Sequence, residues 1–192
     1  GKSYVAMRAT GGTGLKTINS DDAFEHLLKK AGLSLKMPPE EVEPRDIVRG
    51  KAKKLTAARE KNYLEGRLGL IIDGTGRDAD RILRQKAKLE ELGYDTYMIF
   101  VNTSLDIALQ RNAERPRSLP EPIVVNRHKD VQANIGKFSN MFRAGFIVVD
   151  NNNAGEDVFK EVYKRVKGLL RKKVQNTRAK DWMASELAKK QR

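Results

Sequence analysis

The sequence predicts an α/β fold in which helices cover both faces of a parallel sheet. Four short segments predict strands, and they alternate with segments whose apolar residues recur at helical spacing. The clearest strand segments are continuous apolar runs, which is typical of parallel strands that are buried on both faces. The 192 residues fit one domain, and the absence of cysteine excludes disulfides, Cys-ligated zinc and a Cys nucleophile.

The first third of the chain predicts a helix, a strand and two further helices. Residues 20–22, Ser-Asp-Asp, offer N-cap oxygens to the second of these helices, and Gly32 ends it. Pro38 and Pro39 mark a loop before the longest helix, and Pro44 lies near the start of that helix. The expected elements are a helix over 2–9, a strand over 15–19, and helices over 23–31 and 41–65.

The rest of the chain alternates strands and helices more regularly. A glycine-bounded apolar run over 68–72 predicts a strand, and Gly93 is well suited to end the helix that follows. A basic loop with several prolines divides the later helices. The expected elements are strands over 68–72, 96–101 and 146–149, and helices over 78–92, 104–113, 123–142 and 156–170.

The positive charge is concentrated at the C-terminal end. The chain has a formal net charge of +13, and residues 160–192 alone have a net charge of +9. This charge favours either a solvated helical face or a contact with a polyanion through phosphate neutralisation. Because Trp182 stands apart from other aromatic residues, it does not predict a base-stacking platform. We therefore expect one domain over 1–170 and a basic tail, helical or disordered, over 171–192.

The sequence also bears on location and on the start of the chain. No apolar run approaches the roughly 20 residues of a membrane-spanning helix and no signal peptide opens the sequence, which predicts a soluble, cytoplasmic protein. The chain begins Gly1-Lys2-Ser3 without an initiator Met. We therefore expect a fragment whose true N-terminus lies upstream.

Two segments near the N-terminus carry residues suited to phosphate chemistry. Gly1-Lys2-Ser3 matches the end of a Walker A loop, in which the amides and the Lys hold phosphates and the hydroxyl binds Mg²⁺. Asp22 follows a candidate strand, so it would face the crevice where α/β proteins bind ligands and accept a proton from a hydroxyl. The alternative is that Asp22 and its neighbours only cap the next helix.

Two later segments place an acid and several arginines at the ends of other elements. Asp73 follows an apolar strand as a Walker B acid does, which suits Mg²⁺ binding, and Arg77 begins the next helix, where it could contact an anionic substrate. The alternative is a tight turn with a capping Asp. Arg111, Arg115 and Arg117 are typical of a lid that stabilises a transferring phosphoryl group. The alternative there is a solvent-exposed basic loop.

These residues together resemble the zeta-toxin-like P-loop kinases, in particular the small kinases of this type in tailed bacteriophages. The resemblance covers most of residues 1–170. It is carried by Gly1–Ser3, Asn19–Phe24, Ile71–Arg77, Gly93–Tyr97, and Arg111 with Arg117. It implies a three-layer P-loop NTPase-type sheet with helices on both faces, lacking its first strand because that strand would precede Gly1.

The resemblance also implies a catalytic base, a metal pair, a substrate pair and a phosphate clamp. The catalytic base would be Asp22, and the metal would be held by Ser3 and Asp73. The substrate would be bound by Thr75 and Arg77, and the phosphate clamp would consist of Arg111 and Arg117. Asp22 would touch the substrate as well. Gly1, Lys2 and Ser3 would hold ATP together with the two arginines.

The implied activity is transfer of the γ-phosphate of ATP, with Mg²⁺, to a hydroxyl of a small molecule. Characterised zeta toxins phosphorylate a UDP-amino sugar, so a nucleotide sugar is one acceptor to consider, but the acceptor does not carry over with the fold. Two alternatives stay open, a polynucleotide 5′-hydroxyl kinase and a non-enzymatic basic nucleic-acid-binding module. Because most of the phosphate loop would precede Gly1, we expect residues 1–192 alone to be inactive and a chain extended upstream to be active.

Overall fold

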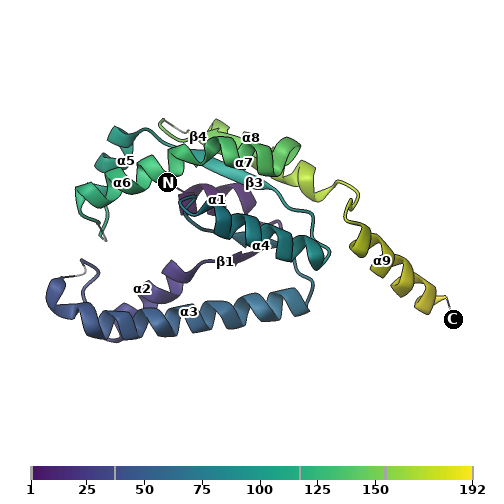
Figure 1. The fold of residues 1–192 in the computed structure, drawn as a ribbon, viewed down its shortest axis with the longest axis horizontal. Coiled ribbons are helices and arrows are strands. Elements are labelled where there is room, and N and C mark those ends of the chain that lie inside the picture. The colour runs from purple at the N-terminus through teal and green to yellow at the C-terminus, as the bar shows by residue number, and fades with distance from the viewer. Residues whose placement is uncertain (1, 37, 117, 154, 192) are drawn as a thin grey trace. The chain divides into compact units, whose positions relative to one another are not determined.

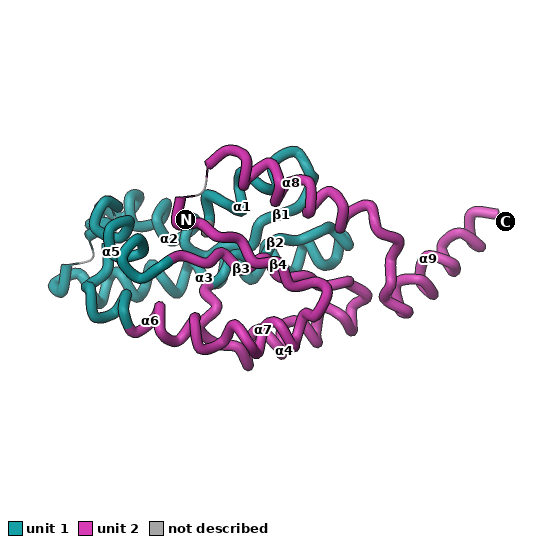
Figure 2. The backbone as a smooth tube through the Cα atoms, turned by 90° about the horizontal axis from the view of Figure 1, so that it is seen from above, with its two compact units in different colours: residues 1–74, 104–125 teal, residues 75–103, 126–192 magenta. Residues whose placement is uncertain are grey.

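The computed structural model describes residues 2–36, 38–116, 118–153 and 155–191, with only the backbone of Lys2 (Figure 1). The chain divides into two compact units (Figure 2). Unit 1 consists of Gly1–Gly74 and Ser104–Val125, and unit 2 of Thr75–Thr103 and Asn126–Arg192. Each unit is therefore built from two separate stretches of sequence.

Unit 1 contains a parallel strand pair and a packed helix pair. Strand β1 (Lys16–Ile18) pairs with β2 (Leu70–Ile72), with Ile18 opposite Ile72. The other elements are α1 (Lys2–Thr10), α2 (Ser20–Lys30), the 3₁₀ turn η1 (Pro39–Glu41), α3 (Val42–Glu65) and α5 (Leu105–Ala113). Helix α6 (Glu121–Ala133) begins in unit 1 and continues into unit 2.

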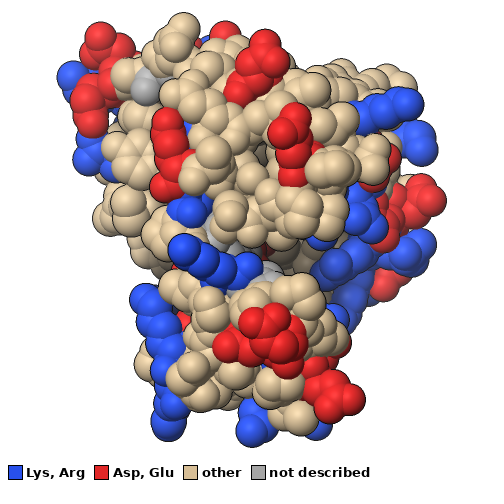
Figure 3. Space-filling model, turned by 90° about the vertical axis from the view of Figure 1, so that its left-hand side faces the viewer, with Lys and Arg blue, Asp and Glu red and all other residues tan. Residues whose placement is uncertain are grey.

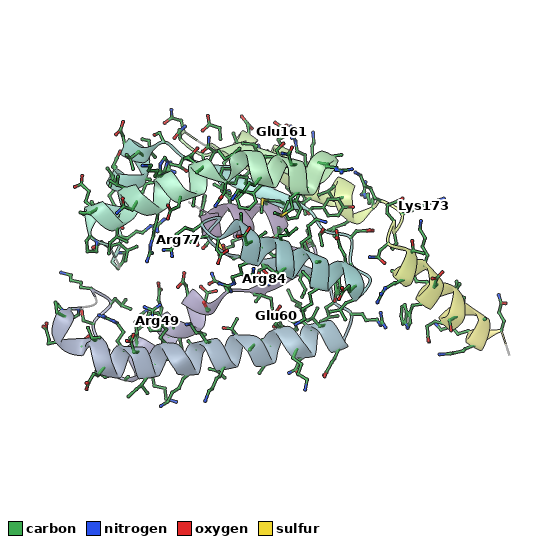
Figure 4. All side chains as sticks on the ribbon, in the orientation of Figure 1. Arg49, Glu60, Arg77, Arg84, Glu161 and Lys173 are labelled. Carbon is green, nitrogen blue, oxygen red and sulfur yellow. The ribbon has the colours of Figure 1, made fainter. Side chains whose placement is uncertain are left out.

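Helices α2 and α3 bury a core between them. Phe24 and Leu28 from α2 pack with Val48 and Ala52 from α3, since these apolar residues recur at helical spacing on one face of each helix. The guanidinium of Arg49 lies 4.4 Å from the centroid of the Phe24 ring, a cation–π contact. Figure 4 shows Arg49 on α3, on the side that faces α2. This core holds the start of α2 firmly against α3.

Unit 2 contains the second parallel pair and the larger aromatic core. Strand β3 (Met98–Asn102) pairs with β4 (Phe146–Asp150) along all five residues. Phe100 lies 6.2 Å from Phe138 and 6.0 Å from Phe146 between ring centroids. The helices are α4 (Ala79–Glu91), α7 (Ile135–Phe142), α8 (Glu156–Leu170) and α9 (Thr177–Lys190), with the 3₁₀ turn η2 (Arg143–Gly145) before β4.

The structure confirms the α/β class and the parallel pairing of the strands. Each pair has two strands and lies in its own unit, so a continuous three-layer sheet stays a prediction. Most boundaries differ from expectation by one to three residues, and two differences concern the site region and the later helices. Helix α2 begins at Ser20 because Asn19 is its N-cap, which corrects the predicted cap at residues 20–22. The helix expected over 123–142 is divided at Asn134 into α6 and α7.

The basic segment after α8 contains a helix that is anchored to α4. The side-chain amide of Asn176 donates hydrogen bonds to the carbonyl oxygens of Glu90 (2.7 Å) and Tyr94 (3.3 Å). Arg178 donates to the carbonyl of Glu91 at 3.0 Å. These contacts hold α9 at the C-terminal end of α4. Among the described residues, no helix has both the length and the apolar character needed to cross a membrane.

Candidate functional site

The polar residues that follow β1 and β2 lie close together because the two strands are parallel. Their last paired residues are Ile18 and Ile72. One residue further along, the backbone N–H of Asp73 donates to the carbonyl of Ile18 at 3.0 Å, which extends the pairing past the strand end. Asn19 and Asp73 therefore stand side by side at the carboxyl edge of the pair, where α/β proteins bind ligands.

One oxygen of the Asp73 carboxylate, Oδ2, accepts hydrogen bonds from residues of two other segments, the start of α1 and the N-cap of α2. The hydroxyl of Ser3, in the first turn of α1, donates to Asp73 Oδ2 at 2.8 Å. The amide Nδ2 of Asn19 donates to the same oxygen at 2.9 Å. The structure thus brings together two of the predicted site residues, Ser3 and Asp73, although 70 positions separate them in the sequence.

Asn19 is a site residue that the sequence interpretation missed. Its Oδ1 accepts a hydrogen bond from the backbone N–H of Asp21 at 2.7 Å and so caps α2. Asp22 lies in the first turn of that helix, with an exposed side chain. A signal was present, because an Asn between a strand and a helix is a common N-cap, but the adjacent Ser20 and two acids offered the same chemistry.

The chemistry of Ser3 and Asp73 fits a magnesium ion shared with phosphates. Both residues offer hard oxygen atoms, which Mg²⁺ prefers. Two neighbouring ligands of an octahedral Mg²⁺ lie about 3 Å apart, close to the 2.8 Å between Ser3 Oγ and Asp73 Oδ2. Within the described residues, no group of three or more His, Asp or Glu side chains could hold a metal. A metal at this edge would therefore depend on substrate phosphates for further ligands.

The predicted substrate residues Thr75 and Arg77 follow Asp73 and belong to unit 2. Thr75 is exposed. Arg77 lies in the turn just before α4, whose N-cap is Asp78, and it lines a cavity of about 280 Å³ together with residues from the start of α4 and of α7. Its guanidinium lies 3.8 Å from the carboxylate of Asp130. Figure 4 labels Arg77 just ahead of α4.

The loop that carries Arg77 is held by Asn134, which the sequence interpretation also missed. The Asn134 amide donates to the carbonyl oxygens of Gly76 (3.0 Å) and Arg77 (2.8 Å). A Cβ on Gly76 would lie 3.1 Å from the Phe138 ring, so glycine allows the loop to pass this close to α7. Asn134 and Phe138 therefore help to fix the turn that carries Arg77.

The predicted arginine lid lies after α5. Arg111 is half-buried in the last turn of α5, and Arg115 is exposed just beyond it. The side chain of Asn112 binds the backbone of Leu119 twice, donating to its carbonyl at 2.8 Å and accepting from its N–H at 2.9 Å. This pair of bonds closes the loop. Three predicted positions cannot be placed, since Gly1, Arg117 and the Lys2 side chain lie outside the described residues.

A comparison with known families identifies the chain. The sequence profile of the zeta toxin family matches residues 41–164. The chain belongs to the zeta toxin family. This match confirms the resemblance to the zeta-toxin-like kinases at the level of the family and makes the protein a P-loop kinase-like phosphotransferase. No curated protein matches the chain.

The family match includes only part of the candidate site. Asp73, Arg77 and Arg111 lie within residues 41–164. Ser3, Asn19 and Asp22 precede the matched stretch, and their inclusion in the site rests on the hydrogen bonds and helix start described above. The Ser3–Asp73 bond thus connects a residue outside the match to one within it.

The charges on the face of the molecule shown in Figure 3 are mixed rather than separated. Figure 3 shows Lys and Arg side chains interspersed with Asp and Glu side chains over the face in view. This agrees with the sequence, in which residues 160–192 carry +9 of the total charge of +13. Residues 1–159 carry the remaining +4, so positive charge there contributes at individual positions and not as a broad basic field.

Proposed function

We propose that the protein is a kinase that transfers the γ-phosphate of ATP to a hydroxyl group of a small molecule. The observation that carries the proposal is the contact between the Ser3 hydroxyl and the Asp73 carboxylate, at the carboxyl edge of a parallel strand pair. P-loop kinases need this pair of oxygens, one from the end of the phosphate loop and one from the end of a strand, to hold Mg²⁺. Membership of the zeta toxin family supports the reaction class.

In this proposal, Ser3 and Asp73 hold Mg²⁺, and the end of the phosphate loop at residues 1–3 holds the phosphates. Mg²⁺ and ATP, when bound, supply the transferable phosphoryl group and the neutralisation of its negative charge. The helix α1 that begins at Lys2 directs its first backbone N–H groups toward its N-terminus, which favours an anion there. Lys2 would add a positive charge at the same place.

Asp22 is proposed to act as the general base. The acceptor hydroxyl would bond through its oxygen to the γ-phosphorus while Asp22 takes its proton. The bond between the γ-phosphorus and the bridging oxygen to the β-phosphate breaks, and ADP leaves with that electron pair. Asp22 is exposed in the first turn of a helix whose start is held by Asn19 and by the α2–α3 core, so its backbone position is well defined.

The remaining predicted residues are proposed to bind the substrates at either end of the transfer. Thr75 and Arg77 would contact the acceptor, and an anionic acceptor such as a nucleotide sugar suits the Arg77 guanidinium. Arg111 and Arg117 would stabilise the charge on the transferring phosphoryl group.

A matched pair of variants tests the proposal. Asp21 and Asp22 are adjacent exposed acids in the first turn of α2, so Asp21→Asn and Asp22→Asn remove the same charge from the same helix end. In the complete gene product that contains these residues, Asp22→Asn should lower kcat for ATP-dependent phosphorylation at least about 100-fold. Asp21→Asn should stay within about threefold of wild type. Equal losses in both variants would show that Asp22 contributes only charge and capping.

The basic tail favours a second candidate, a polynucleotide 5′-hydroxyl kinase. Residues 160–192, which include most of α8 as well as the tail, carry a net charge of +9, which suits a phosphate backbone. Deleting the tail would remove the Asn176 bonds to α4, so charge-removing substitutions in α9 are the better test. Lys180→Gln with Lys190→Gln should weaken phosphorylation of an oligonucleotide at least threefold if this candidate holds. The same change at Lys53 and Lys54 of α3 is the control, and equal effects would exclude a specific role for the tail.

A further inference from the structure

The side chain of Asn19 uses both ends of its amide at the proposed site. Nδ2 donates to Asp73 Oδ2 at 2.9 Å, and Oδ1 accepts from the N–H of Asp21 at 2.7 Å. The orientation of the amide follows from these partners. If it were turned over, its carbonyl oxygen would face the carboxylate of Asp73 and its NH₂ group would face the N–H of Asp21. Both contacts would then be repulsive.

The oxygen that Asn19 holds is the one that Ser3 also holds. Asp73 Oδ2 accepts from Ser3 Oγ at 2.8 Å and from Asn19 Nδ2 at 2.9 Å. Two donors on one oxygen restrict the rotation of the carboxylate about its side-chain bonds. The orientation of Asp73 is therefore set jointly by the first turn of α1 and by the N-cap of α2.

Few side chains can do both tasks of Asn19. The residues that cap helices well are Asn, Asp, Ser and Thr. Asp has no N–H to donate to another carboxylate, and the hydroxyl of Ser or Thr is too short to cap α2 and reach Asp73 as well. Asn is the strong capping residue whose side chain has both an acceptor and a separate donor.

We infer that Asn19 is a positioning residue that couples the metal-binding carboxylate of Asp73 to the first turn of α2, which carries Asp22. This inference rests on the proposed kinase function. The Asn19 amide fixes the start of α2, the helix that carries Asp22. The same amide also fixes the plane of the Asp73 carboxylate, which would face the metal. Loss of the Asp73 contact alone should therefore disturb Mg²⁺ dependence and turnover while α2 keeps its cap.

The substitution Asn19→Ser separates the two tasks, because Ser still caps α2 but lacks the donor to Asp73. In the complete gene product, kcat should fall 10- to 100-fold, a typical effect of removing a partner that orients a metal ligand. The Mg²⁺ concentration that half-saturates binding of a fluorescent ATP analogue should rise about tenfold. The midpoint of thermal unfolding should stay within about 2 °C. Asn19→Ala should show the same kinetic changes and a lower midpoint as well.

Two further variants sharpen the result. Asn176→Ser changes another N-cap whose amide donates to backbone carbonyls, so it should leave kcat and Mg²⁺ dependence unchanged. Combined with Asp73→Asn, Asn19→Ser should add little further loss of kcat, since both changes act on one contact.

The outcomes that contradict the inference are distinct from failure of the kinase assignment. If wild type is active and Asn19→Ser retains its kcat and Mg²⁺ dependence while Asn19→Ala does not, Asn19 is a helix cap and no more. If wild type neither transfers phosphate nor binds the ATP analogue with Mg²⁺, the proposed function is wrong and the inference falls with it.

Discussion

Replacing Asn134 with alanine is expected to destabilise unit 2 and to loosen the loop that carries Arg77. Asn134 is 8% exposed, and its amide is bound to the carbonyl oxygens of Gly76 at 3.0 Å and Arg77 at 2.8 Å. Alanine would leave both carbonyls without this donor. Asn134 lies between α6 and α7, where the helix is interrupted. The backbone there offers no regular helical N–H that could replace the side-chain amide as donor to these carbonyls.

The size of the effect follows from these contacts. Leaving a buried polar group without a hydrogen bond costs about 1–3 kcal/mol. Gly76 is half-buried and Arg77 is exposed, so water can compensate more fully at the second carbonyl than at the first. We therefore expect a loss of about 2–3 kcal/mol in the free energy of unfolding.

Urea denaturation monitored by circular dichroism measures this loss, with Asn140→Ala as the control. Asn140 is an exposed residue of the same helix, α7, and its replacement should change stability by no more than about 0.5 kcal/mol. If the kinase assignment holds, Asn134→Ala should also raise KM for the acceptor more than it lowers kcat, because Arg77 would be less well placed. A loss equal to that of Asn140→Ala would refute the reasoning, since the two amide bonds would then carry no net stability.

Three further changes test other parts of unit 2. Burial raises the pKa of the Glu90 carboxyl, but hydrogen bonds from Lys86 and Thr96 outweigh it and hold the pKa below its ordinary value. A carboxyl with a lowered pKa stabilises the fold above its unfolded-state pKa, and this contribution is lost as the pH falls. Glu90→Gln should therefore lower the free energy of unfolding by about 0.5–1 kcal/mol at pH 7 and by almost nothing near pH 3, as measured by urea denaturation. An equal loss at both pH values would contradict this. Phe138→Ala removes a fully buried ring and should cost about 3–5 kcal/mol by the same measurement, with a loss below about 1 kcal/mol showing that the core has been misassigned. Gly93→Ala places a side chain at a φ of +102° and should lower stability by about 1–2 kcal/mol, and an unchanged midpoint would mean that the turn relaxes at no cost.

The sequence predicted the elements well where periodicity or punctuation was strong. Helix α8 lies over the predicted residues 156–170, and the long helix α3 starts one residue later than expected. Strand β2 is shorter than its apolar run, because only Leu70–Ile72 pair with β1. A run of apolar residues shows what is buried and not how much of it finds a partner strand.

The proximity of Ser3 and Asp73 was predictable from sequence motifs, whereas hydrogen bonds that depend on the tertiary fold were not. Ser3 and Asp73 follow from the residue types at the end of a phosphate loop and at the end of a strand. The tasks of Asn19, Asn112 and Asn134 did not follow. Asn19 donates to a carboxylate 54 positions away, and Asn134 donates to carbonyls 58 and 57 positions away, and nothing local marks these bonds. Asn112 bonds to the backbone of Leu119, seven positions further along the chain. The sequence predicted that the C-terminal tail is basic. It did not predict that Asn176 attaches this segment to α4, because that contact is known only from the fold.

The two hydrogen bonds between the Asn112 side chain and the Leu119 backbone bear on how the length of this loop can vary within the family. Because one side chain closes the base of the loop, the residues between need no fixed number to keep α5 and the chain after Leu119 in place. Insertions and deletions there should be tolerated among relatives, together with changes in the number and spacing of arginines. The scaffold would thereby accommodate substrates of different size while the arrangement around Ser3 and Asp73 stays the same.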